Sequence, residues 1–322
     1  MKDLEVIHES KGRRFLFAVE TSDKLADYTK YEELRYEIWK DPDDNFSAAR
    51  NMAGENIFND GSSLYIGIYI EGENGGFPRN REHLVGFSYG YVGIRDLNIG
   101  YRNPANLEFY SQYASVKPDF KKYGLGLFLK QFQRQKVIGI LGINTITCTF
   151  DPLTGVNAYR NFHIFGMEVI AYKEAFYKGF AGKLNRADVP SDRLFVSWDL
   201  NKEIMRPEYD LDLLLGENRL IIYSESREVK GKTGQVCLPL VKKSGCPLGN
   251  ILLIEIPYDF YTMLQETDVL DKEVRNIPVD WRKKTNEAFS SILKDGYKII
   301  DFRYKKIKDR MRDFYVLSKD IK

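Results

Sequence analysis

A glycine-containing turn near the middle of the chain has the residues to bind an anion. Residues 116–126 read VKPDFKKYGLG, and apolar side chains then recur at the i, i+3, i+4, i+7 spacing of an amphipathic helix: Leu125, Phe128, Leu129 and Phe132. The first turn of a helix presents unpaired N–H groups and a partial positive charge, which attract phosphate groups. Residues 120–150 contain no Asp or Glu, but they contain Lys121, Lys122, Lys130, Arg134 and Lys136. The segment predicts a phosphate-bearing ligand; the alternative is a tight strand-to-helix connection followed by a solvated basic helix face.

Two other phosphate-binding motifs are excluded by single residues. A dinucleotide fingerprint starting at Gly124 would need glycine at position 129, which is Leu129. Residues 231–233 read GKT like the end of a P-loop, but the first glycine of that loop would fall on Ser226.

The elements that must position this turn follow from hydrophobic periodicity and turn residues. Up to about residue 200 we expect strands at 14–20, 64–71, 83–92, 107–116, 145–150, 168–177 and 193–200, with helices at 25–40, 47–58, from 125 onward, and at 157–165. Beyond a break at 201–211 we expect strands at 219–223, 251–256, 297–304 and 314–317, a loop-rich middle, and two helices, the second at 279–293. This order predicts an α+β fold with a mixed sheet.

Length and composition set broader limits. A chain of 322 residues is about twice an ordinary domain, so we expect two packed units. Aromatic residues reach 14%, which favours a sheet-rich protein. A formal net charge of +2 gives no global reason to expect nucleic acid or an anionic membrane as a partner.

Cysteine and histidine usage predicts no metal site and no disulfide framework. No CxxC or zinc-ligand spacing occurs among the three cysteines and three histidines: Cys148, Cys237, Cys246, His8, His83 and His163. We expect Cys148 to be a buried core residue and His163 to be structural. The first residues contain no apolar signal-peptide core, and no apolar run approaches the ~18 residues of a membrane span, so we expect a cytoplasmic protein.

A family resemblance adds to this interpretation. The strand, the turn Lys121-x-x-Gly124-x-Gly126 and the following helix resemble motif A of the GCN5-related N-acetyltransferases (GNAT), where the first position is usually Arg or Gln. The element order matches that fold, and residues 149–153, 157–158 and 190–194 with Trp198 resemble an uncharacterised subfamily of predicted acetyltransferases. The resemblance implies a mostly antiparallel central sheet flanked by helices in a GNAT-like domain at 1–202. A smaller α+β domain would occupy 203–322, and its element order resembles half of a similar fold.

The resemblance also implies a site for acyl-CoA, with acetyl-CoA as the expected cosubstrate and no metal. The backbone of Ala114, Ser115 and Val116 would bind the pantetheine like an added strand. The pyrophosphate would lie on the turn and the start of the helix: Lys121, Lys122, Tyr123, Gly124, Leu125, Gly126 and Leu127. Asn157 and Asn161 are candidates for further CoA contacts, with helix capping as the alternative.

Transfer of the acyl group to an amine needs a base, donors to the oxyanion and a proton for the leaving thiolate. The resemblance places the usual catalytic Glu at Tyr110, and Glu108 lies two residues earlier on the same face of the strand, so both are candidate catalytic residues. An exposed Glu at the strand end is the alternative for Glu108. The Tyr that protonates the thiolate in many family members corresponds to Phe162, which cannot donate a proton.

The sequence thus predicts an N-acyltransferase that acetylates a primary amine on a small molecule or peptide in a ternary complex. A non-catalytic acyl-CoA-binding module is the alternative, favoured by Phe162. The identity of the amine and the role of residues 203–322 stay open, and so does the formation of a homodimer.

Overall fold

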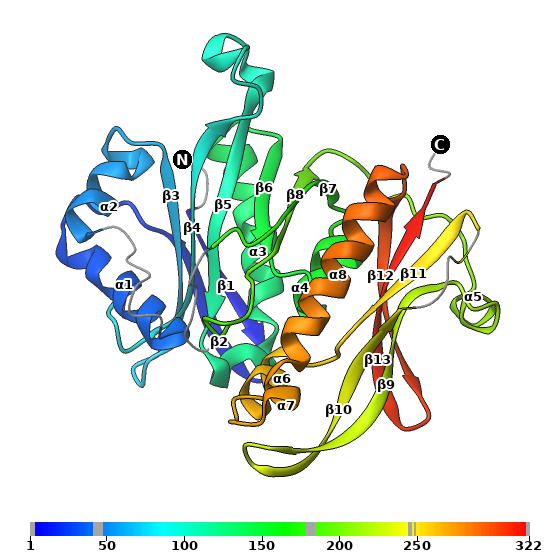
Figure 1. The fold of residues 1–322 in the computed structure, drawn as a ribbon. Coiled ribbons are helices and arrows are strands. Elements are labelled where there is room, and N and C mark those ends of the chain that lie inside the picture. The colour runs from blue at the N-terminus through cyan, green and yellow to red at the C-terminus, as the bar shows by residue number, and fades with distance from the viewer. Residues whose placement is uncertain (1–3, 41–47, 178–183, 244–246, 248, 320–322) are drawn as a thin grey trace. The chain divides into compact units, whose positions relative to one another are not determined.

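A computed structural model describes residues 4–40, 48–177, 184–243, 247 and 249–319 (Figure 1). The chain divides into two compact units, one of residues 1–148 with 199–201 and one of residues 149–198 with 202–322. The domain boundary predicted between residues 202 and 203 stays a prediction.

The first unit is built on a sheet whose strands follow chain order. Its strands are β1 (Glu5–Ser10), β2 (Arg13–Val19), β3 (Ser63–Ile70), β4 (Leu84–Ile94), β5 (Leu107–Val116) and β6 (Thr145–Phe150), and the last two residues of β6 belong to the second unit. Neighbours from β1 to β5 are antiparallel, and β5 and β6 are parallel. The mixed, mostly antiparallel sheet expected from the sequence is confirmed.

Helices lie against opposite faces of this sheet. Leu16 and Ala18 of β2 pack in one core with α1 (Ala26–Trp39) and α2 (Ala49–Glu55). The alternate residue Phe17 meets Phe128 of α3 (Leu125–Lys136), with ring centroids 4.7 Å apart. Short 3₁₀ and π segments complete the unit at Ile57–Asn59, Gly100–Arg102, Pro104–Asn106, Pro118–Tyr123 and Val137–Leu141.

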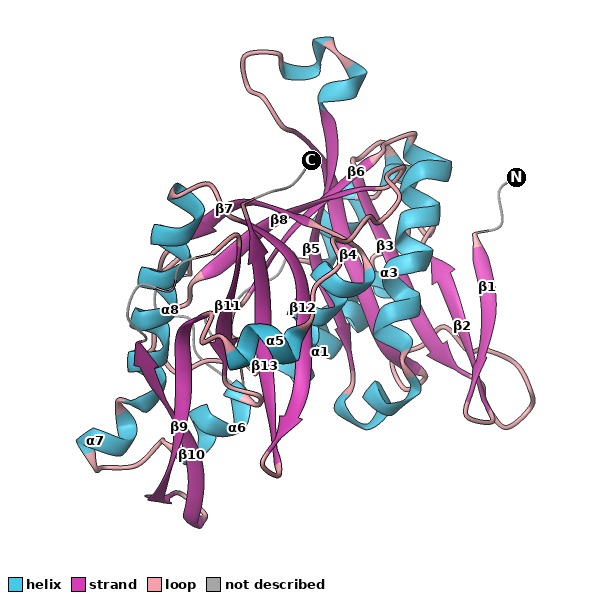
Figure 2. Cartoon of the chain, turned by 90° about the vertical axis from the view of Figure 1, so that its right-hand side faces the viewer, coloured by secondary structure: helices cyan, strands magenta, loops and turns pink. Residues whose placement is uncertain are grey.

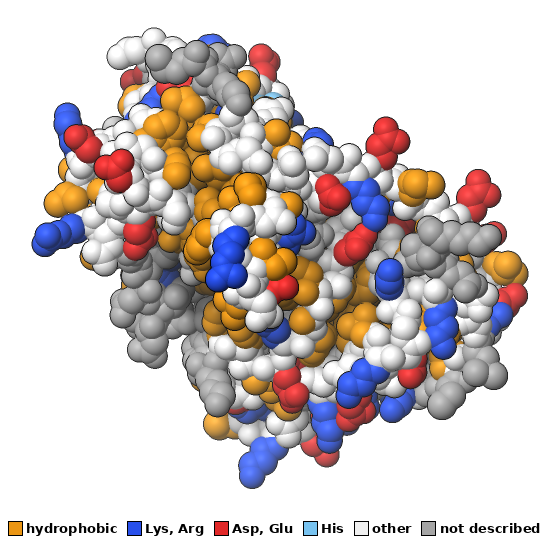
Figure 3. Space-filling view, turned by 90° about the horizontal axis from the view of Figure 1, so that it is seen from above, with side chains coloured by type: hydrophobic (Ala, Val, Ile, Leu, Met, Phe, Trp, Pro, Cys, Tyr) orange, Lys and Arg blue, Asp and Glu red, His pale blue; other side chains and the backbone are white. Residues whose placement is uncertain are grey.

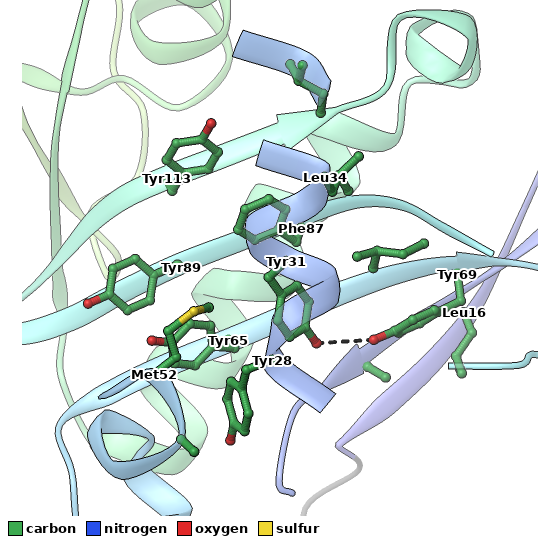
Figure 4. Close-up of a cluster of buried hydrophobic side chains, with 14 residues drawn as sticks. Leu16, Tyr28, Tyr31, Leu34, Met52, Tyr65, Tyr69, Phe87, Tyr89 and Tyr113 are labelled. Carbon is green, nitrogen blue, oxygen red and sulfur yellow. Dashed lines mark hydrogen bonds between the residues drawn. The ribbon is translucent and has the colours of Figure 1, made fainter. Parts of the chain in front are cut away.

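Tyrosines supply most of the buried rings in the core between α1 and the sheet. Figure 4 shows Tyr31 of α1 directed at Tyr69 of β3, with the ring of Tyr28 beside that of Tyr65. The hydroxyl groups of Tyr31 and Tyr69 lie 3.1 Å apart, and Tyr31 also donates to Glu20 Oε2 at 3.0 Å. Burying a hydroxyl without a partner is costly, so this paired arrangement lets large polar-tipped rings serve as core residues.

The second unit contains a five-stranded sheet with the order β10-β9-β11-β13-β12 (Figure 2). These strands are β9 (Leu220–Gly231), β10 (Gly234–Lys243), β11 (Ile251–Ile256), β12 (Lys298–Ile307) and β13 (Arg310–Ser318). Helix α8 (Ile277–Lys294) packs on β9, β10 and β11, and its Trp281 is fully buried and donates to the carbonyl of Pro239.

The remaining elements of the second unit come from both sides of residue 202. β7 (Glu168–Lys173) pairs antiparallel with β8 (Arg193–Asp199), and α4 (Gly155–Ala158) continues into a π-helical turn, Tyr159–Ile164. Three short helices follow β8 along the chain: α5 (Leu211–Gly216), α6 (Phe260–Glu266) and α7 (Lys272–Arg275). No described helix is long and apolar enough to cross a membrane.

Candidate functional site

The glycine turn joins β5 to α3 through a 3₁₀ turn, Pro118–Tyr123. Gly124 has a φ of +69°, a left-handed conformation that favours glycine, and its carbonyl accepts from the N–H of Leu127 at 3.0 Å. Gly124 is also the N-cap of α3 and has no side chain to fill the first N–H groups, and the first turn of α3 contains no acidic residue. The backbone donors of Leu125 and Gly126 are thus the part of the turn suited to an anion.

The basic side chains near the turn fall into two groups. Lys121 and Lys122 are exposed beside it, where they can attract a phosphate. Lys130 and Lys136 are buried, and Arg134 Nε donates to the carbonyl of Leu200 at 3.1 Å. Two of the three basic residues of α3, Lys130 and Lys136, are therefore turned into the protein, and the alternative of a solvated basic helix face applies to Arg134 alone. On the face of the molecule drawn in Figure 3, Lys and Arg side chains lie interspersed with Asp and Glu.

The strand that leads into the turn separates from its parallel neighbour. The register of β5 with β6 covers Phe109 with Ile146 and Tyr110 with Thr147, near the start of β5. The pairing of β5 with β4, in contrast, continues to Val116 opposite Gly86.

Backbone alternation then determines which groups of β5 face the β6 side. The N–H of Lys117 donates to the carbonyl of Val85 at 2.8 Å, so by alternation Ser115 exchanges hydrogen bonds with Phe87 on β4. The backbone groups of Ala114 and Val116 point the other way, toward the side on which the ladder with β6 has ended. Of the three residues predicted to bind pantetheine, Ala114 and Val116 direct their backbone N–H and C=O groups to the side where a ligand could pair with them. Ser115 directs its backbone groups toward β4.

Glu108 and Tyr110 lie where β5 still pairs with β6. Glu108 is only 9% exposed, opposite Gly93 of β4, so the alternative of an exposed strand-end Glu is wrong. Burial raises the pKa of Glu108, while the nearby Thr147 side chain and the positive charge of Arg95 partly lower it. Tyr110 is half-buried, and its ring centroid lies 5.5 Å from that of Tyr91.

A buried polar cluster at the end of the β5–β6 ladder was not predicted. Lys130 Nζ of α3 donates to Ser111 Oγ at 2.6 Å and to Gln133 Oε1 at 3.2 Å, and Ser111 Oγ donates to Gln133 Oε1 at 2.9 Å. Ser111 directly follows Tyr110 and lies in a β-bulge. Two residues of β5, 111 and 112, lie opposite the single residue Gly90 of β4. The sequence did contain a signal for this cluster: a polar residue, Ser111, at an inward position of a strand, and Lys130 and Gln133 three positions apart on the next helix.

The other candidate residues belong to the second unit. Asn157 Nδ2 donates to Thr154 Oγ1 at 3.3 Å, and Asn161 is buried in the π-helical turn. Phe162 is buried too, with its ring 6.0 Å from Phe150 and 5.8 Å from Tyr315. A role for the two asparagines in CoA binding stays a prediction.

The residues expected to be structural have partners that fit that expectation. Cys148 is buried, which raises the pKa of its thiol, although the positive charge of Lys130 partly lowers it. His163 Nδ1 lies 2.8 Å from Oδ1 of the buried Asp301, which also accepts from the hydroxyl of Tyr209 at 2.6 Å. Cys237 is exposed, and Cys246 lies outside the described residues. Within the described ranges, no group of three His, Cys, Asp or Glu side chains is arranged to hold a metal ion.

Comparison with known proteins gives structural likenesses alone. No family model matches the sequence, and no curated protein matches it. Among solved structures, the chain is similar to NAA60 of Arabidopsis thaliana in complex with a bisubstrate analogue, at 13% identity and a TM-score of 0.43 over 58% of this chain and 99% of that chain.

Two further solved structures are similar to this chain at comparably low identity. One is an acetyltransferase of the GNAT family from Desulfovibrio desulfuricans, at 13% identity and a TM-score of 0.35 over 58% of this chain and 99% of that one. The other is the ribosomal-protein-S18-alanine N-acetyltransferase of Escherichia coli, at 12% identity and a TM-score of 0.38 over 60% of this chain and 99% of that one. At these identities and scores, the likeness is one of fold alone.

Proposed function

We propose that this protein is an acyl-CoA-dependent N-acyltransferase, with acetyl-CoA as donor and a primary amine as acceptor. The observation that carries the proposal is the course of β5, which leaves β6 after Tyr110 and runs on into the Gly124-capped start of α3. An extended ligand with a polar amide arm and a pyrophosphate end suits such an arrangement. Its arm would pair with the outward backbone groups of Ala114 and Val116, and its phosphates would meet the N–H groups of Leu125 and Gly126.

Three parts of the reaction fall to this chain's own residues. Glu108 would accept the proton of the attacking ammonium group, directly or through a water, because burial holds its pKa closer to the working pH than that of a solvated Glu. The backbone N–H of Ala114, the outward group nearer to the point where β5 leaves β6, would polarise the thioester carbonyl. Lys121 and Lys122, both exposed, would neutralise the phosphates. The amine attacks in the ternary complex, so no covalent acyl-enzyme is required.

The test of the binding site is a charge placed in the first turn of α3. Gly126→Glu adds a carboxylate that repels the pyrophosphate, while Glu is well tolerated in a first helical turn. We expect CoA affinity, measured by calorimetry, to fall by about tenfold or more. Gly126→Ala is the matched control without the charge, and it should retain affinity and stabilise the helix by up to about 1 kcal/mol. Equal CoA affinity in the Glu variant and the wild type would mean that the pyrophosphate binds elsewhere.

A non-catalytic acyl-CoA-binding module is the second candidate. The observation that favours it is Phe162, which is buried among Phe150 and Tyr315 at the position where a proton-donating Tyr is common in the resembled family. Acetyl-CoA mixed with a panel of amines, with free thiol as the readout, separates the two candidates. Release of thiol with any amine supports the enzyme, and tight CoA binding with no release across the panel supports the module.

A further inference from the structure

The buried cluster of Ser111, Lys130 and Gln133 is expensive to maintain. Lys130 is 6% exposed, and placing its ammonium group away from water costs far more than placing an apolar side chain there. Gln133 is fully buried, and its Nε2 has no hydrogen-bond partner within the part of the chain that the structure describes. A cluster with a spare buried donor is poorly explained by packing alone.

The position of the cluster suggests what it is for. Ser111 is the residue after Tyr110, at which the pairing of β5 with β6 ends, and Lys130 approaches it from α3. The charge of Lys130 is felt on β6, where it partly lowers the pKa of the Cys148 thiol. The ammonium group thus lies beside the point where the two parallel strands separate, with Glu108 two positions before Tyr110 on β5.

We propose that Lys130 and Ser111 supply the proton to the thiolate that leaves when the acyl group is transferred. This inference rests on the proposed function, because it takes the thiol end of CoA to reach the point where β5 leaves β6. It gives the chain a proton donor although Phe162 cannot be one.

The proton transfers balance as follows. The amine nitrogen forms a bond to the thioester carbon, the carbon–sulfur bond breaks, and its electron pair stays on sulfur. Ser111 Oγ gives its proton to that sulfur, after its hydroxyl turns from Gln133 Oε1, and takes a proton from Lys130 Nζ. Glu108 takes the first proton from the ammonium group, and the second proton, which the nitrogen loses as the amide forms, passes to water. Exchange with water then restores Lys130 and Glu108, so that one proton is released overall.

The experiment measures the thiol of bound CoA rather than turnover. Thiolate absorbance of CoA bound to the protein, followed as a function of pH, gives the pKa of its thiol. An ammonium group nearby should lower that pKa by about 1 to 3 pH units relative to free CoA. Lys130→Met removes the charge but keeps an apolar stem, and it should return the thiol pKa to that of free CoA. The control is Lys136→Met, which removes a buried Lys from the end of the same helix and should leave the lowered value unchanged.

Other variants separate the possible failures. Ser111→Ala keeps the ammonium group, so it should retain the lowered thiol pKa but release thiol more slowly. If Lys130→Met does not fold, as judged by thermal denaturation, Lys130→Gln replaces it as a neutral polar variant. An equal thiol pKa in the wild type and a folded neutral variant overturns the inference while leaving CoA binding intact. A wild type that binds no CoA overturns the proposed function itself, and the inference with it.

Discussion

At the scale of single residues, burial gives Glu108 the properties of a general base. Its pKa is raised because burial disfavours the charged form, so the folded protein keeps a proton that the unfolded chain releases at lower pH. Stability should therefore fall as pH rises from the ordinary Glu value through the raised one. A base with this pKa should also make the rate of acyl transfer rise over the same interval.

Glu108→Gln tests both effects. The rate should fall by about 10²–10⁴-fold, as expected for loss of a general base. The decrease of the rate at acidic pH, which protonation of Glu108 would cause, should disappear from the pH profile. The free energy of unfolding should not fall at neutral pH, because no buried charge remains; urea denaturation over a pH series measures this. Glu73→Gln, at an exposed position, is the control. Undiminished turnover of the Gln variant into the alkaline range would remove Glu108 from the reaction.

Single residues also show where sequence reasoning stops. The left-handed conformation of Gly124 was predictable because the turn needs it and glycine permits it. The burial of Lys130 was not, since five basic residues within a stretch that contains no acidic residue suggest a solvated surface. Only the approach of α3 to β5 reveals that Lys130 turns inward to Ser111. Likewise, no local pattern distinguishes a buried Glu108 from a solvated one.

At the scale of elements, Asp151 and Arg282 join the end of β6 to α8 within the second unit. Both side chains are almost fully buried, and Arg282 donates from both terminal nitrogens to the two carboxylate oxygens at 2.7 and 2.6 Å. The positive charge of Arg282 lowers the pKa of Asp151 against the effect of burial. Removing either partner would strand the other charge away from water.

Arg282→Met should therefore lower the free energy of unfolding by about 3–5 kcal/mol, measured by urea denaturation. The double variant with Asp151→Leu should recover much of that loss, because it leaves no buried charge. Arg275→Met is the control, at exposed ion pairs with Asp188 and Asp268, and should lower the free energy of unfolding far less than Arg282→Met does. A double variant as unstable as Arg282→Met alone would contradict this account.

Elements with a strong local signal were predicted best. The limits of β5, β6 and β11 are those expected, since their apolar and β-branched runs end at clear turn residues. The loop-rich middle predicted after residue 223 was wrong: β9 continues to Gly231 and pairs with β10 in a long hairpin. Charged and polar residues occupy most of the outer half of that hairpin, so its period-2 pattern carries little hydrophobic contrast. The edge strand β1, with alternate residues exposed, was missed for the same reason.

At the scale of the whole molecule, the open question is where one folding unit ends. The predicted boundary between 202 and 203 follows the extent of the family resemblance. Residues 149–198, however, share buried contacts with residues beyond it. The hydroxyl of Tyr315 donates to the carbonyl of Pro152 at 2.7 Å, and the ring of Tyr172 stacks on Phe289 with centroids 5.7 Å apart. With the Asp151–Arg282 pair, these contacts tie the segment after β6 to the C-terminal residues.

A fragment of residues 1–202 should therefore be less stable than the same residues in the full chain. Asp151 would lose its guanidinium partner. Phe162 and Tyr172 would be exposed to water, and each exposed ring should cost up to about 3 kcal/mol. Urea denaturation of the fragment should show a lower midpoint and a shallower transition than the full chain, and amide exchange should be fastest in β7 and the π-helical turn. If the fragment unfolds cooperatively at the midpoint of the full chain, with β7 protected, the boundary at 202 is a true folding boundary. The contacts of residues 149–198 with the C-terminal sheet would then be an interface between two independently stable domains.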